Sequence, residues 1–572
     1  MGGMLGKRGS LVVDHSMDEV QLHNMGRGSL KRGSVSTITT TGNDPPIYES
    51  CLKGQLETPQ EKKARKRSHK IVYCLIFVQS ISISISLGVW PYLHEELVPS
   101  LTKKSLAWVG AANPFGMMVA GPLFGIWANK TGSIRPPCIA AAIMFITGNV
   151  MFALLGAFKG LGTMAPYYGM IVSRFTLGGS SGTVTLCWSY LASSTTVKKR
   201  TLSLNFAFIG QACGLVIGPV IQSLITMALP EDIDTAVDWF KWNKYTVTSF
   251  VSASFGLVIL VILLPCVFKE YNISEKEGAM MTNSNSPDEQ STKFSKLDYG
   301  ALGGILYARF GILFVAVLTE TLAVPVAMDQ YAWSENTAMI MVGSALSIAG
   351  VLNIAVYILG GILSKRVDER LLFLGLGMLP VVIGMFLFIP WGKNIIPMQT
   401  CDTGNETTSF TSVTETTTIA DLVGAGPLSL SANEDNQHCS EGCPEIQDWC
   451  HHTPQLPEIQ FMIGFFVAFI GFASAQSFMV GIYSKMLGPK PQGVWMGVIG
   501  AAGSLSRVSG PIVVSYVYFE LGTRWCFGIL TIVTAAALLG TTLLYRRLVP
   551  MRVLSQRDSQ GYDGPGAEGN KI

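Results

Sequence analysis

Charged side chains are scarce in this chain of 572 residues. They make up 14% of it, against about 25% in a typical soluble domain, whereas hydrophobic residues make up 49%. A chain of this length with so few charges cannot cover itself with a polar surface, which excludes a series of soluble domains. The small net charge of +3 argues against a large nucleic-acid-binding surface. The composition therefore predicts a multi-pass membrane protein.

The sequence also lacks the motifs of several enzyme classes. It contains no Walker phosphate-binding loop, which argues against ATP-driven pumping. Its apolar segments contain no His-x-x-x-His pair and no paired carboxylates for a metal ion. The first 60 residues are polar and have no signal-peptide core, so we expect the first apolar segment to be retained. We expect neither an enzyme nor a protein with a metal or cofactor.

Apolar segments long enough to cross a bilayer recur along the chain. A spanning helix needs about 20 mostly apolar residues. Twelve segments meet this requirement: 71–93, 105–128, 136–158, 166–191, 201–229, 246–268, 303–328, 337–363, 371–391, 457–484, 493–519 and 525–545. The pattern predicts an all-α membrane protein with twelve transmembrane helices.

A polar linker at 269–302 divides these segments into halves of six, at 70–268 and 303–547. Polar tails at 1–69 and 548–572 flank the halves, and the first tail is expected to be disordered. Lys and Arg concentrate in the loops on the side of the two tails. Because cytosolic loops are enriched in these residues, both termini are predicted to be cytosolic.

The long loop 393–456 lies on the opposite side of the membrane in this prediction. It contains four of the eleven cysteines: Cys401, Cys439, Cys443 and Cys450. Their clustering in a non-cytosolic loop predicts two disulfides, whose pairing stays open. Their spacing from nearby histidines matches no standard zinc site, so we expect no metal. Asn405 begins a glycosylation sequon on the same side.

The fifth and eleventh segments share a pattern of small residues followed by proline. The residues are Gly214, Gly218 and Pro219 in the fifth segment, and Gly510 and Pro511 in the eleventh. Their recurrence six segments apart indicates a duplicated half. Small residues let helices approach closely, and proline permits a bend, so we predict gating or hinge positions. Ordinary close helix packing is the alternative.

The loop after the second segment carries a further motif, made by Gly125, Asn129, Lys130 and Gly132. Together with the two halves, this motif resembles the major facilitator superfamily. The resemblance implies two six-helix halves around a central cavity, and transport by alternating access. The superfamily usually has Asp where Asn129 stands.

Longer strings resemble one family within this superfamily, the ceroid-lipofuscinosis transporters of late endosomes and lysosomes. The strings are Trp90-Pro91-Tyr92-Leu93, Met328-Asp329-Gln330-Tyr331-Ala332-Trp333 and Leu487-Gly488-Pro489-Lys490-Pro491-Gln492-Gly493. The resemblance implies a late endosomal or lysosomal membrane. The plasma membrane is the alternative, because neither tail contains an acidic dileucine signal. The resemblance also implies a basic residue near Trp188, so this chain is expected to lack one cavity charge.

Four ionisable residues inside the predicted spans are candidates for the chemistry: Glu320, Asp329, Arg174 and Arg507. Charges within lipid are costly, so each is a functional candidate. Glu320 is predicted to exchange protons, and the two arginines to attract an anion. A structural pair between Glu320 and Arg507 is the alternative.

These observations predict a transporter of a small anionic solute across an endolysosomal membrane, coupled to protons. An uncoupled chloride channel of the same fold is the first alternative. A non-transporting membrane scaffold or sensor is the second. The expected partners are the lipid bilayer, the anion and protons, and no nucleic acid.

Overall fold

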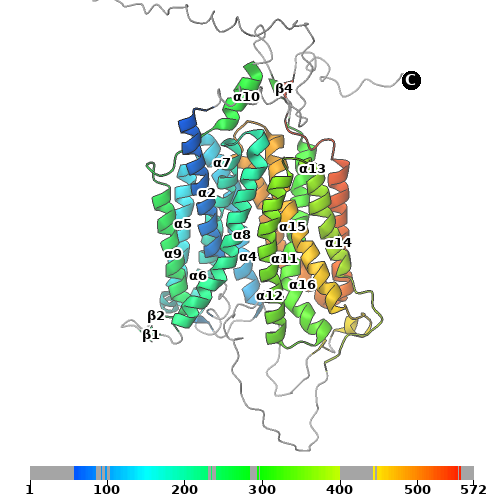
Figure 1. The fold of residues 1–572 in the computed structure, drawn as a ribbon. Helices are drawn as coiled ribbons and strands as arrows, with labels where there is room; N and C mark the ends of the chain where they lie inside the picture. The colour runs from blue at the N-terminus through cyan, green and yellow to red at the C-terminus, as the bar shows by residue number, and fades with distance from the viewer. Residues whose placement is uncertain are drawn as a thin grey trace, which may run out of the picture. The chain divides into compact units, whose positions relative to one another are not determined.

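The computed structural model describes residues 57–85, 92, 97–98, 103–229, 233–234, 240–283, 293–294, 297–399, 442–444, 447–551 and 553–554. Over these residues the chain is mainly α-helical, and long helices pack side by side (Figure 1). Asn405, Cys401 and Cys439 lie outside the described residues.

The described residues of the first half form seven α-helices and one 3₁₀ helix. They are α2 (Pro59–Ile85), α4 (Lys103–Thr131), α5 (Arg135–Ala153), η2 (Leu155–Leu161), α6 (Ala165–Ser180), α7 (Gly182–Ser193), α8 (Val197–Ala228) and α9 (Lys244–Ile262). A short antiparallel pair, β1 (Ile233–Asp234) and β2 (Lys241–Trp242), connects α8 to α9. Helix α10 (Ile273–Asn283) lies in the linker.

The second half contains α11 (Tyr299–Tyr331), α12 (Glu335–Leu363), α13 (Glu369–Leu372), the π-helical η3 (Phe373–Met378), α14 (Leu379–Leu387), α15 (Glu458–Leu487) and α16 (Gly493–Leu543). The 3₁₀ helix η5 (Asp448–His451) lies in the loop before α15. Strands β3 (Lys293–Phe294) and β4 (Val553–Leu554) pair the linker with the C-terminal tail.

Each of the twelve predicted segments contains helix. Helices α6 and α7 share the fourth segment, and α13, η3 and α14 together make the ninth. Helix α16 contains the eleventh and twelfth segments and turns at Gly522, whose φ of 77° favours glycine. Among the described residues, nine helices are long and apolar enough to cross a membrane. These helices confirm an all-α membrane fold.

The prediction of a disordered tail is wrong for residues 59–69, because α2 begins at Pro59. Thr58 and Glu61 cap this helix: the Thr58 backbone N–H donates to the Glu61 carboxylate at 2.8 Å. Arg65 forms an ion pair with Glu57 and donates to the Ser194 carbonyl at 3.1 Å. These contacts with a distant part of the chain order a segment that its polar composition alone would leave unfolded.

The two halves share a core at one end of the helices only. We call this the linker end, because α10 lies there, and the opposite end the loop end. The core at the linker end includes Trp188 and Phe208 of the first half and Ile305, Tyr357 and Phe478 of the second. At the loop end, each half has its own buried hydrophobic cluster, and no cluster contains residues of both halves among the described residues. The halves are therefore joined at the linker end.

Candidate functional site

Arg309 on α11 is a buried cation between the two halves. Its side chain is 6% exposed, and its guanidinium carbon lies 5.7 Å from the centre of the Trp188 ring on α7. Trp188 packs against Phe208 of α8 with ring centres 5.4 Å apart, and Phe208 stacks on Tyr357 of α12 at 5.6 Å. The Arg309 charge thus lies beside a row of three aromatic rings, two from the first half and one from the second.

The donors of Arg309 are not all used. Its Nε and Nη1 atoms are buried, and within the described part of the chain neither has a hydrogen-bond partner. The Nε1 atom of Trp188 is also buried and has no hydrogen-bond partner among the described residues. Each unsatisfied buried donor costs about 1–3 kcal/mol, so such groups are suited to a ligand that accepts hydrogen bonds. An oxyanion or a halide satisfies both the donors and the charge.

Glycine at position 503 makes room for Arg309. A Cβ atom on Gly503 of α16 would lie 3.2 Å from Nε of Arg309 and closer still to a methyl carbon of Leu313. Arg309 is not evident from the sequence because it lies only six residues inside the predicted segment 303–328, where an arginine reaches the membrane surface easily. Its contacts with Gly503 and Trp188 join distant parts of the chain and are visible only in the structure.

Two of the predicted residues, Glu320 and Arg507, lie on neighbouring helices. Both side chains are exposed, although Leu318 and Leu322 beside Glu320 are buried. The charges of Glu320 and Arg507 attract each other, but no ion pair joins them among the described residues. Arg507 also repels Arg309, because both side chains are positively charged. Arg507 is therefore electrostatically linked to both a carboxylate and a second cation.

Arg174 occupies a different place. It is buried on α6, and its guanidinium carbon lies 5.2 Å from the centre of the Phe152 ring on α5. Both helices belong to the first half. The structure thus places Arg174 in the packing of one half, whereas Arg309 lies between the halves beside Trp188, where the family resemblance implied a missing charge.

The predicted loop motif closes the linker end. Asn129 at the end of α4 accepts a hydrogen bond from the Gly493 backbone N–H at the start of α16. A Cβ on Gly125 would overlap the Gly493 carbonyl, so only glycine allows this approach. Gly132 has a φ of 65°, which turns the chain after α4. Lys130 is exposed.

The predicted hinge residues pack within each half. A Cβ on Gly214 would overlap the α2 backbone at Phe77, and the Ser84 hydroxyl of α2 donates to the Gly214 carbonyl at 3.2 Å. Gly218 also meets Ser84. Gly510 faces Val317 and Leu318 of α11. Pro219 and Pro511 lie inside their helices. The contacts are close helix packing, and a hinge role stays a prediction.

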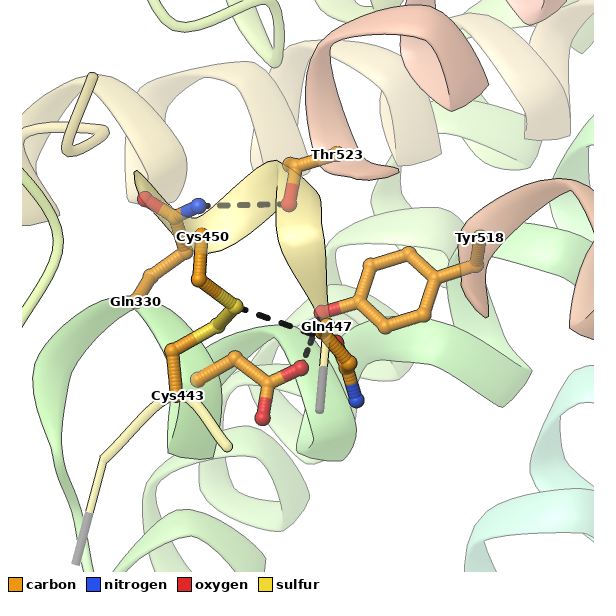
Figure 2. Close-up of a disulfide and its surroundings, with 7 residues drawn as sticks. Gln330, Cys443, Gln447, Cys450, Tyr518 and Thr523 are labelled. Carbon is orange, nitrogen blue, oxygen red and sulfur yellow. Dashed lines mark hydrogen bonds between the residues drawn. A yellow bond between two sulfur atoms is a disulfide. The ribbon is translucent and has the colours of Figure 1, made fainter. Parts of the chain in front are cut away.

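Asp329 lies at the loop end of α11, where its carboxylate accepts a hydrogen bond from the Tyr518 hydroxyl at 2.6 Å. The neighbouring Gln330 donates to the Thr523 hydroxyl at 3.2 Å (Figure 2). The side-chain oxygen of Gln330 accepts from the Leu456 backbone N–H at 2.8 Å. Asp329 therefore belongs to a network that anchors the loop before α15.

A disulfide joins Cys443 and Cys450 beside this network (Figure 2). Trp449, between the two cysteines in sequence, packs on Gly522 and lies with its ring centre 5.4 Å from that of Tyr518. The pairing that the sequence left open is thus assigned for these two cysteines. In the described residues, no group of three or more His, Cys, Asp or Glu side chains could hold a metal ion.

The fold and these contacts define a membrane protein of two helical halves with a buried positive charge between them. The family model of the Major Facilitator Superfamily matches residues 72–426. The chain is 31% identical to Major facilitator superfamily domain-containing protein 8 of Xenopus laevis over 517 residues, covering 90% of this chain and 98% of the relative. The chain belongs to the Major Facilitator Superfamily, which confirms the predicted family and fold class.

Solved structures share the fold at low identity. The human organic anion transporter MFSD10 (TETRAN) has a TM-score of 0.54 and 14% identity, covering 85% of this chain and 100% of that one. The proton:xylose symporter XylE has a TM-score of 0.57 and 14% identity, covering 86% and 97%. The chain is thus a membrane transporter of a superfamily whose members are carriers of small solutes rather than enzymes.

Proposed function

We propose that this protein is a secondary transporter that moves a small anionic solute across an endolysosomal membrane. The observation that supports this proposal is the buried guanidinium of Arg309, with unused donors, between residues of both halves. A neutral solute gives no compensation for this charge, whereas an anion compensates it and accepts its hydrogen bonds. Arg507 adds a second positive charge that acts on the same region.

The contacts suggest how access alternates. The linker end is closed by Asn129 and Gly493 and by a buried Arg200, which donates to the Ser484 carbonyl of the other half at 3.1 Å. With the linker end cytosolic, the solute enters from the loop end, which is the luminal side in this proposal. Rocking of the halves then breaks the linker-end contacts and releases the solute to the cytosol.

Proton coupling follows from the electrostatic link between Glu320 and Arg507. While Glu320 is ionised, it neutralises part of the charge of Arg507. Protonation of Glu320 leaves Arg507 free to attract the anion together with Arg309. In this scheme one proton accompanies the anion, and the acidity of an endolysosomal lumen favours loading from that side.

The experiment is anion-dependent thermal stabilisation of the purified protein. Chloride, inorganic phosphate, glutamate and citrate are the probes, at constant ionic strength. At least one should raise Tm in the wild type, and Arg309→Gln should lose that rise. Arg309→Lys should keep part of it. Arg524→Gln removes an exposed arginine of α16 and serves as the control. An equal rise in Arg309→Gln overturns the anion site.

The orientation of the protein in the membrane and the organelle in which it resides are tested separately. Loss of a glycan from the Asn405→Gln variant, seen as a gel shift, supports a luminal loop. A glycan attached on the opposite side contradicts it. Co-fractionation of the full chain with lysosomal membranes supports the proposed location, and recovery in the plasma membrane fraction supports the alternative.

A further inference from the structure

Four cations follow one face of α2 before the helix enters the predicted membrane segment. They are Lys63, Lys66, Arg67 and Lys70, all exposed. Their spacing of three and four residues places them on a single helical face. The face 180° away is buried in the first half, where it includes Ser68, His69 and Val72. The four cations, which we call the basic stripe, therefore point away from the protein.

The charges of the basic stripe have no counter-charge in the part of the chain that the structure describes. No hydrogen bond or ion pair of these four residues occurs among the described residues. The nearby acids have other roles: Glu57 pairs with Arg65, and Glu61 caps α2 through Thr58. Four exposed cations of one sign on one face repel each other, so a bound polyanion would stabilise them.

The position of the basic stripe indicates where that polyanion comes from. The same helical face continues to Cys74, four residues after Lys70, which is exposed inside the predicted span 71–93. The face that meets lipid tails at Cys74 thus carries the cations directly above the lipid headgroups. Because α2 runs unbroken through this boundary, the helix holds the stripe at a fixed height.

The length of the basic stripe favours a lipid headgroup with several phosphates over one with a single phosphate. Lys63 and Lys70 are seven residues apart, which is about 10 Å along the helix axis. The phosphodiester of a simple acidic lipid lies at the level of Lys70 and leaves the outer cations unpaired. A headgroup with further phosphates on a ring extends outward beside Lys66, Arg67 and Lys63.

We propose that the basic stripe binds a polyphosphorylated lipid headgroup in the leaflet that faces the linker end. Charge complementarity and continuity with the lipid-facing surface both support this occupant. The proposal uses the membrane placement given above but not the anion site. Lipid binding to the purified chain can therefore be measured independently of the anion site, so failure of one proposal is distinguishable from failure of the other.

The test uses the full-length protein in nanodiscs of phosphatidylcholine, with a phosphatidylinositol bisphosphate added at low mole fraction. Native mass spectrometry counts the bound lipid. We expect the wild type to retain it, and the variant with Lys63, Lys66, Arg67 and Lys70 all changed to Gln to lose it. Each single change should weaken binding by about fivefold.

The control variant removes the same number of charges elsewhere on the linker end: Lys365→Gln, Arg366→Gln, Lys490→Gln and Arg546→Gln, all at exposed positions. It should retain the lipid. If the stripe variant does not fold, the double variant Lys63→Gln/Lys66→Gln replaces it, because these two stripe residues lie farthest from the predicted span. A variant with the three stripe lysines changed to Arg should bind as the wild type does.

Three outcomes overturn the proposal. The first is equal retention of the lipid by the stripe and control variants. The second is equal retention of phosphatidylserine, which has a single phosphate. The third is equally tight binding of free inositol polyphosphate, since that result identifies a soluble anion rather than a lipid as the occupant.

Discussion

The side-chain oxygen of Asn129 accepts a hydrogen bond from the backbone N–H of Gly493 at 2.9 Å. Gly493 is the first residue of α16, so Asn129 caps a helix that belongs to the other half of the protein. Its side-chain nitrogen also approaches the Pro491 carbonyl at 3.5 Å. A neutral amide satisfies both groups, whereas the Asp usual in the superfamily accepts from Gly493 and repels the carbonyl. The departure from the family motif thus has a local explanation.

The Asn129→Ala variant should loosen the linker end. It leaves a backbone N–H without its partner, at a cost of about 1–2 kcal/mol, which is about a tenfold change in the closed population. The measurement is the labelling rate of a Thr185→Cys residue, with native cysteines replaced, by a thiol reagent added from the linker side. Thr185 packs against Gly500 of the other half and is 2% exposed.

Asn129→Asp keeps the acceptor for Gly493 and should label more slowly than Asn129→Ala. Lys365→Ala removes an exposed residue from the corresponding loop of the second half and should label as the wild type does. Labelling of Asn129→Ala at the wild-type rate would show that this contact does not hold the halves together.

The sequence predicted the helices well because membrane spans need long apolar runs, and these are visible residue by residue. The extension of α2 to Pro59 was not predictable in this way. It depends on contacts such as that of Arg65 with Ser194, more than a hundred residues away. The sequence pointed to part of the candidate site, and the roles of those residues stay predictions. Glu320 and Arg507 stood out as charges deep inside apolar segments, but Arg309 did not, because its importance comes from Trp188 on another helix.

Loss of the Cys443–Cys450 disulfide should destabilise the loop end. A short closed loop of this kind contributes about 2–3 kcal/mol to the free energy of unfolding. The disulfide also holds Trp449 against Gly522, where α16 turns. We expect the variant with both cysteines changed to Ser to have a lower Tm than the wild type, and mass spectrometry without reductant to find the 443–450 cross-link. Free thiols at both positions would contradict the assignment.

The Glu320→Gln variant should separate transport from the proton gradient. Glutamine keeps the size of the side chain and removes its charge, so Arg507 no longer feels the attraction of a carboxylate at this position. Currents are recorded with a fixed chloride gradient while the pH on one side is changed. The reversal potential of the wild type should move with pH, and that of Glu320→Gln should not.

Glu458→Gln removes an exposed carboxylate at the start of α15 and should respond to pH as the wild type does. A wild-type current that reverses at the chloride potential and ignores pH would favour the channel alternative. In that case Glu320 would have a gating or structural role.

The stability of the protein should fall in mild acid because of His69, which lies just before the first predicted span. Its ring is 8% exposed, and Nε2 forms a hydrogen bond with the Ser194 hydroxyl at 2.8 Å. Burial, with a further contribution from the charge of Arg65, lowers the pKa of His69 from 6.5 to about 4. The folded protein therefore keeps the neutral ring at a pH where the unfolded chain binds a proton.

The contribution of the neutral His69 ring to the free energy of unfolding is complete above pH 6.5 and is lost as the pH falls toward 4. At pH 5 the loss is about 2 kcal/mol. The measurement is Tm in detergent between pH 7.5 and 5. His69→Gln keeps a hydrogen-bonding group toward Ser194 and cannot titrate, so its Tm should fall less than that of the wild type. His452→Gln, at an exposed position, should follow the wild type. Parallel curves for wild type and His69→Gln would mean that the folded state also protonates this ring near its ordinary pKa, and that the contact with Ser194 does not exclude the charged form.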